Sequence, residues 1–165
     1  MSLASAIEAE RRGNVSEAAA RYEDAIGAGD RSLQVLLNLA VLYWRVLDPG
    51  SGNEVRPEPW DTASRRLPEL LGEARRRYPE SVEARFWERY IRWMDFGGAP
   101  LGREECLDML RDDPSCLTPA MHLLVASDGK EAREEARELL RKSRNMETIG
   151  ARYVVSVIEE LLRES

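Results

Sequence analysis

The single histidine and the two cysteines carry the most versatile side-chain chemistry in this chain. His122 stands between Met121 and Leu123, and the thiols belong to Cys106 and Cys116. A nucleophilic site needs a Ser or Cys beside a base that a third group orients. No nucleophile elbow or other catalytic motif accompanies the histidine. We therefore expect a structural histidine, two free thiols and no enzymatic activity.

Metal and nucleotide sites also lack their sequence patterns. A zinc site needs several His, Cys or carboxylate ligands at set spacing, and one histidine with two scattered cysteines does not supply them. The acidic pairs Glu104-Glu105, Asp112-Asp113 and Glu134-Glu135 are sequence neighbours, which diverge by about 100° on a helix and so do not face each other. No glycine-rich phosphate loop is present. The sequence predicts no metal and no cofactor.

The charge balance restricts the kinds of partner. The 165 residues include 24 Lys and Arg against 30 Asp and Glu, a formal net charge of −6 at pH 7. A field of this sign repels phosphate backbones, so we expect no nucleic-acid partner. No run of about 18 apolar residues and no secretory leader is present, which predicts a soluble, cytoplasmic protein without a membrane span. Only Lys130 and Lys142 are lysines, an arginine bias associated with GC-rich bacterial genomes.

Apolar residues recur at helical spacing, whereas alternating strand patterns and Asn-Gly hairpin turns are missing. The chain is therefore predicted to be all-α, with a single domain over residues 1–165 built from eight or nine antiparallel helices. The expected helices cover, approximately, residues 2–12, 14–27, 32–47, 61–78, 81–96, 102–112, 119–127, 130–143 and 147–163.

Three local signals interrupt or divide this helical pattern. Gly13-Asn14 is a C-cap signal for the first helix. Asp48–Pro59, rich in proline and glycine, is expected to be the one long loop. Pro68 is expected either to kink the following helix or to split it. The helix over 82–95 is predicted to place one half in the core, namely Val82, Phe86, Trp87, Tyr90, Ile91, Trp93 and Met94.

Small and aromatic residues repeat at an offset of 34 residues near the N-terminus: Ala6 is followed by Ala40, and Ala9 by Tyr43. The turn and the second helix add Gly13, Val15 and a small–aromatic–small series at Ala18, Tyr22 and Ala25, and the next helix carries Asn38-Leu39-Ala40 before Tyr43. This pattern resembles the tetratricopeptide repeat (TPR), whose period is about 34 residues. The resemblance is specific over about residues 4–47 and partial to about 95. It implies TPR-like hairpins forming an α-α superhelix over about 2–95, with divergent helices over about 101–165.

By this resemblance, the first helix of each hairpin lines a concave groove that binds a peptide or protein. The side chains implied to line it are Leu37, Asn38, Val41, Trp44, Arg45, Phe86, Arg89 and Tyr90. Asn38 can hydrogen-bond a peptide backbone, and Arg45 and Arg89 can each hold a carboxylate through two hydrogen bonds. The alternative is that the aromatic residues only fill the core.

Two hypotheses of function follow. The first is a non-enzymatic protein–protein interaction module, a scaffold for an unknown peptide or protein partner. The alternative is a small acidic inhibitor or immunity-type protein that blocks a partner enzyme, suggested by the 14 acidic against 10 basic residues of the segment 101–165. Self-association into a homo-oligomer is also possible through the last expected helix, whose apolar residues are Val154, Val155, Val157, Ile158, Leu161 and Leu162.

Overall fold

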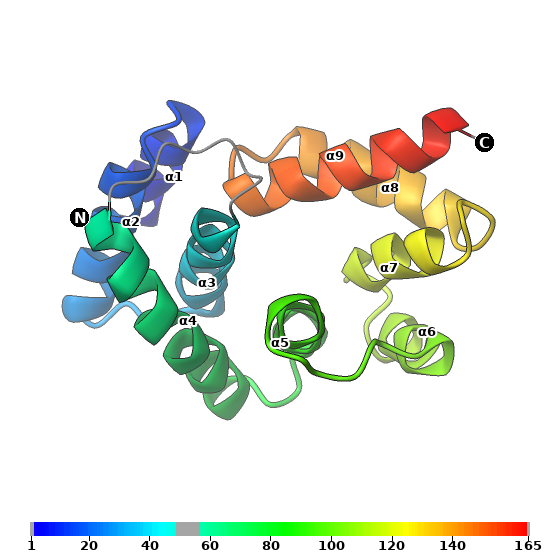
Figure 1. The fold of residues 1–165 in the computed structure, drawn as a ribbon, viewed down its shortest axis with the longest axis horizontal. Coiled ribbons are helices and arrows are strands. Elements are labelled where there is room, and N and C mark those ends of the chain that lie inside the picture. The colour runs from blue at the N-terminus through cyan, green and yellow to red at the C-terminus, as the bar shows by residue number, and fades with distance from the viewer. Residues whose placement is uncertain (1, 49–56, 165) are drawn as a thin grey trace. The chain divides into compact units, whose positions relative to one another are not determined.

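The computed structural model describes residues 2–48 and 57–164. These residues form nine α-helices and no strand, which confirms the predicted all-α class (Figure 1). The helices are α1 (Leu3–Arg11), α2 (Val15–Gly27), α3 (Leu33–Leu47), α4 (Pro57–Arg77), α5 (Val82–Asp95), α6 (Arg103–Asp112), α7 (Thr118–Ala126), α8 (Arg133–Arg144) and α9 (Ile149–Glu164).

The chain divides into two compact units. Unit 1 takes in residues 1–79 and 147–150, and unit 2 takes in residues 80–146 and 151–165. The helix α9 therefore starts in unit 1 and continues in unit 2. The predicted single domain over residues 1–165 stays a prediction.

In unit 1, consecutive helices pack against one another: α1 on α2, α2 on α3 and α3 on α4. The helix α3 is central to this core, because ten of its fifteen residues are buried. Such a broad apolar surface needs neighbours on more than one side, and α2 and α4 supply them. The links from α1 to α2 and from α2 to α3 are short, at residues 12–14 and 28–32.

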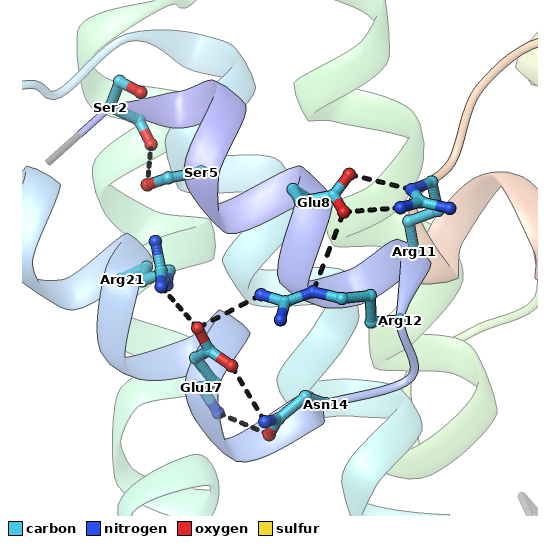
Figure 2. Close-up of polar contacts among 8 residues, drawn as sticks. All are labelled: Ser2, Ser5, Glu8, Arg11, Arg12, Asn14, Glu17 and Arg21. Carbon is cyan, nitrogen blue, oxygen red and sulfur yellow. Dashed lines mark hydrogen bonds and ion pairs between the residues drawn. The ribbon is translucent and has the colours of Figure 1, made fainter.

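The turn from α1 to α2 follows the expected C-cap signal. Gly13 adopts the left-handed conformation with φ of +76°, and the N–H of Asn14 donates to the carbonyl of Ala9 at 3.0 Å. The Asn14 side chain then accepts from the N–H of Glu17 at 3.1 Å and so caps α2. Figure 2 shows this turn, with the Glu17 carboxylate also contacted by Arg12 and Arg21. The predicted cap at Gly13-Asn14 is confirmed.

The helix α4 differs from the expectation at its start. It begins at Pro57, so residues 57–59 of the predicted Asp48–Pro59 loop are helical, and residues 49–56 lie outside the described part. Of the two alternatives expected for Pro68, a split and a kink, the split is absent, since the helix runs unbroken to Arg77. A proline inside a helix costs about 3 kcal/mol. The buried Leu67 and Leu70 on either side offset that cost by packing in the core.

In unit 2, α5 packs against α6 and α7, α6 packs on α7, and α7 packs on α8. The predicted core half of α5 is buried from Val82 to Ile91. The prediction that Met94 lies in the core is wrong, because its exposed fraction is 45%. Trp93 is only half-buried. Both lie in the last turn of α5, which ends at Asp95. The apolar face of the sequence therefore extends one turn beyond the part of the helix that packs in the core.

Candidate functional site

The groove residues expected in unit 1 all lie on α3. Leu37, Val41 and Trp44 are buried within the chain, whereas Asn38 and Arg45 keep part of their surface exposed. The guanidinium carbon of Arg45 lies 5.2 Å from the centroid of the Trp44 ring. The three apolar side chains therefore belong to the core, and the polar pair is what α3 can present to a partner.

Asn38 is also the half-buried end of a chain of hydrogen bonds that leads to a buried carboxylate. Its Nδ2 donates to the Tyr22 hydroxyl at 3.2 Å, and that hydroxyl donates to Oε1 of Glu10. Oε2 of Glu10 accepts from the backbone N–H of Ile149, the first residue of α9, at 2.5 Å. Burial, and then the negative charge of Glu10, raise the pKa of the Tyr22 hydroxyl well above its ordinary value. Both oxygens of this buried carboxylate therefore have a donor.

Sequence reasoning missed Glu10, although one signal pointed to it. Ala6, Ala9 and Glu10 are spaced i, i+3 and i+4, so they share one face of α1, and all three are buried. The same spacing that identified the small residues as packing positions thus places the carboxylate beside them. Its distant donor, the N–H of Ile149, has no local sequence signal.

The groove residues expected in unit 2 lie on α5. Phe86 and Tyr90 are buried and stack on each other with centroids 5.3 Å apart. The Tyr90 hydroxyl is 2.6 Å from that of Tyr153 on α9. Both aromatic residues thus pack within unit 2 rather than forming an open surface.

Arg89 is partly exposed, but three of its nitrogens donate hydrogen bonds within unit 2. Its Nε and Nη2 donate to the two oxygens of Glu105 at 2.7 and 2.9 Å, and its Nη1 donates to the carbonyl of Ala99 at 3.1 Å. The guanidinium lowers the pKa of the Glu105 carboxyl. We expected Arg89 to bind a partner's carboxylate through two hydrogen bonds. In the structure it binds the carboxylate of Glu105 in this way. The α3 set and the α5 set belong to different units.

His122 is enclosed by aromatic rings. Its exposed fraction is 4%, and its ring centroid lies 5.1 Å from that of Trp93 and 6.1 Å from that of Tyr90. Nε2 donates to the carbonyl of Leu101 at 3.1 Å, while Nδ1 is buried with no hydrogen-bond partner among the described residues. Burial lowers the pKa of this imidazole. The environment therefore favours the neutral ring.

The two thiols are poor nucleophiles in this environment. Burial raises the pKa of Cys106 to about 11. Cys116 donates from Sγ to Oε2 of Glu83 at 2.8 Å, and burial together with this carboxylate raises its pKa further. The same carboxylate accepts from Thr118 Oγ1 at 2.8 Å and from Trp87 Nε1 at 2.7 Å. Since the thiolate is the reactive form, both cysteines fit a packing role.

Within residues 2–48 and 57–164, no group of three or more His, Cys, Asp or Glu side chains is placed to hold a metal ion. Among the same residues, no helix combines the length and the apolar character that crossing a bilayer requires. No protein-family model, no curated protein and no solved structure matches the chain.

Proposed function

We propose that the chain is a non-enzymatic protein–protein interaction module whose N-terminal helices are TPR-like hairpins and which binds a peptide or protein partner. The observation that supports this proposal is the burial of the small and aromatic side chains of the repeat pattern, whereas Val15 and Asn38 of the same pattern are half-buried. The buried side chains are those of Ala6, Ala9, Ala18, Tyr22 and Ala40 with exposed fractions of 0%, Ala25 with 1% and Tyr43 with 3%. Small residues at such contacts let two helix backbones approach closely, which the hairpin packing of this repeat class requires.

Among the expected groove residues of α3, Asn38 and Arg45 are the two that keep exposed surface for a partner. Arg45 is paired through Nη1 with Oδ2 of Asp48 at 2.8 Å. Their side chains are 19% and 38% exposed, and pairs with this much exposure contribute about 0–1 kcal/mol. A carboxylate from a partner would compete with Asp48 for the Arg45 guanidinium. Asn38 adds an amide that can bond a peptide backbone.

Arg89 is a weaker candidate for the same task. A partner carboxylate would have to replace Glu105, which takes two hydrogen bonds from the guanidinium, and also disturb the bond to the Ala99 carbonyl. Bidentate, charge-assisted hydrogen bonds between arginine and a carboxylate are stronger than a single hydrogen bond. We therefore assign partner binding first to Arg45 and Asn38 on α3.

The ion pairs of α6 weaken the alternative of an acidic inhibitor. Its exposed carboxylates each pair with an arginine of unit 2, in the pairs Arg103–Glu104, Arg111–Asp108 and Arg85–Asp112. A partner's basic site would meet alternating charges there rather than a uniform negative field. This distribution favours peptide capture over electrostatic blocking.

The test is selection of binding peptides from a random-sequence display library against the full chain, followed by Kd measurements by fluorescence anisotropy. We expect Arg45→Ala to weaken binding about tenfold, equivalent to ~1.4 kcal/mol. Arg12→Ala is the matched control, since Arg12 is an exposed arginine of the same unit that also pairs with glutamates. Selection of no peptide class, or equal losses in the two variants, contradicts the proposal. Selected peptides that are uniformly basic and insensitive to Arg45 would instead support the acidic inhibitor.

A further inference from the structure

Four residues around the start of α9 belong to unit 1, although the rest of that unit ends at Pro79. Residues 147–150 are the only part of the chain beyond Pro79 that unit 1 contains. Thr148 is buried, with an exposed fraction of 5%, and Ile149 and Gly150 are half-buried. We call residues 147–150 the docked segment, because they lie on unit 1 as a short bound peptide would.

Two contacts place the docked segment on unit 1. The backbone N–H of Ile149 donates to Oε2 of Glu10 on α1 at 2.5 Å. An N–H at the start of a helix has no acceptor within the helix, so Glu10 supplies one. On α3, a Cβ built on Gly150 would lie only 3.1 Å from Cγ1 of Val41, so the bare backbone of Gly150 packs directly on that side chain. The docked segment therefore contacts α1 through a backbone donor and α3 through a glycine.

The docked segment lies on the same face of α3 to which we assign the partner. Asn38, Val41 and Arg45 are spaced i, i+3 and i+7, which places them on one side of the helix. Val41, in the middle, is only 4% exposed, and Gly150 packs against it. Asn38 is joined to the docked segment by the chain of hydrogen bonds that ends at the Ile149 N–H. A peptide that spans Asn38 and Arg45 must therefore cross the place that the docked segment occupies.

We propose that the docked segment is an internal ligand of unit 1, and that a partner peptide binds the Asn38–Arg45 face of α3 by displacing it. This inference rests on the proposed function and adds a regulation of the same site. A site that is open for only part of the time binds with an apparent Kd raised by the inverse of its open fraction. A tethered ligand also competes at a high effective concentration, on the order of millimolar for short flexible connections. Weakening the docked segment should therefore strengthen binding of the partner.

The contacts of the docked segment also define the peptide that can replace it. Glu10 is buried, and displacement of the segment removes a donor from its Oε2. Because a buried acceptor without a donor is costly, the incoming peptide should offer a backbone N–H at this position. Opposite Val41 a glycine fits best, since a Cβ would be crowded there. The expected partner segment thus carries an apolar residue followed by glycine, as Ile149-Gly150 does.

The test uses the chain's own segment as the probe. A fluorescently labelled synthetic peptide with the sequence of residues 145–156 is titrated with the full chain and with Gly150→Val, and anisotropy gives the Kd. In the variant, the added side chain collides with Val41, so the tethered segment fits poorly and the site is open more often. We expect the variant to bind the peptide at least about fivefold more tightly than the wild type. The same peptide with valine at the position of Gly150 should bind neither protein.

Gly27→Val is the matched control. Gly27 is also a helical glycine of unit 1, on α2, but a Cβ built there meets nothing within 4 Å. This variant should bind the peptide as the wild type does. Circular dichroism checks that each variant is folded. If Gly150→Val is not folded, Gly150→Ala replaces it, because it adds the smallest side chain and should change the Kd in the same direction.

Four outcomes would overturn the inference. They are equal affinity of the wild type and the Gly150 variant, equal binding of the valine-containing peptide, no binding to the Gly150 variant, and NMR shifts on binding that spare the Asn38 side-chain amide.

Failure of the proposed function gives a different result. If the display library selects no peptide while the synthetic peptide behaves as expected, the proposed function alone is refuted. If library-selected peptides bind the wild type and Gly150→Val with equal affinity, the proposed function stands and displacement of the docked segment is refuted.

Discussion

Glu10 in unit 1 and His122 in unit 2 are both buried polar residues, but they differ in how many of their polar atoms have a hydrogen-bond partner. Glu10 has an exposed fraction of 1%, and each of its oxygens accepts a hydrogen bond, from the Tyr22 hydroxyl and from the Ile149 N–H. His122, with 4% exposed, uses only Nε2, and its Nδ1 has no partner among the described residues. One unit thus satisfies its buried acid fully, and the other keeps a half-satisfied base among aromatic rings.

This difference indicates how each side chain affects the free energy of unfolding. A buried acceptor that serves two donors is costly to delete, because both donors then lose their partner. A buried imidazole with one free nitrogen is tolerated while it is neutral and becomes unfavourable when it gains a proton. The stability of unit 1 should therefore depend strongly on the Glu10 side chain. The stability of unit 2 should depend on pH through the protonation of His122.

Deletion of the Glu10 carboxylate should have the largest effect. Glu10→Ala leaves the buried Tyr22 hydroxyl and the half-buried Ile149 N–H without this acceptor, which should lower the free energy of unfolding by about 2–3 kcal/mol. Urea denaturation measures the change. Glu8→Ala, on the same helix but with a side chain 46% exposed, should cost less than about 0.5 kcal/mol. Similar losses in both variants would show that the buried contacts of Glu10 contribute little.

Acidification should have the next largest effect, through His122. Its folded-state pKa lies below the ordinary value of 6.5, chiefly because of burial. The unfolded chain therefore binds the proton more readily, and stability falls as pH drops from about 6.5 towards the folded pKa, by at most about 1.4 kcal/mol per pH unit.

Urea denaturation at pH 7 and pH 5.5 can isolate this contribution, since His122 is the sole histidine of the chain. His122→Gln should remove most of the dependence in this range. The carboxyl groups whose pKa values are lowered, such as Glu105 and Glu73, affect stability in a lower range, below their unfolded value near 4.5. If the wild type and His122→Gln lose stability equally between these pH values, the histidine is not the cause.

Glu83 offers a smaller test, because it is a carboxylate of unit 2 that does serve several donors. Glu83→Gln removes the charge beside Cys116, so the pKa of that thiol should fall. We expect Cys116 to react several-fold faster with an aromatic disulfide at pH 8, resolved from Cys106 by mass spectrometry. Glu80→Gln, an exposed neighbour in sequence, should leave the rate unchanged. An unchanged rate in both variants would leave burial as the only cause of the low reactivity.

The smallest expected effect concerns Gly72, a half-buried glycine in the interior of α4. Gly72→Ala should raise the free energy of unfolding by about 0.5–1 kcal/mol, because alanine favours the helix. A Cβ at this position would lie 3.2 Å from Nη1 of Arg76, but this guanidinium can move aside, since it is the end of a flexible side chain. Thermal unfolding followed by circular dichroism measures the gain, and a loss of stability would show that Arg76 is held against Gly72.

The helices and several of their ends could be predicted because their causes are local. Apolar spacing identified all nine, and Gly13 with Asn14 marked the turn whose hydrogen bonds the structure contains. The start of α8 was expected near Lys130 but lies at Arg133. The Ser127 hydroxyl accepts from the N–H of Lys130 and of Glu131, which holds this stretch outside the helix.

The candidate site could be predicted only in part, because its contacts join distant residues. Nothing near Arg89 in the sequence marks Glu105 as its partner, and nothing near Glu10 marks Ile149. Hydrophobic character alone also does not distinguish a groove wall from a core. Trp44 and Phe86 therefore entered the predicted lining, although the structure buries them.

The proposed function requires a partner peptide to bind unit 1 through α3. Chemical-shift mapping of the full ¹⁵N-labelled chain with a library-selected peptide tests it most directly. The account predicts shifts of the Asn38 side-chain amide and of the Arg45 Nε–H signal at low peptide concentration. Shifts confined to α6 and α8 of unit 2, with Asn38 and Arg45 unchanged, would contradict it.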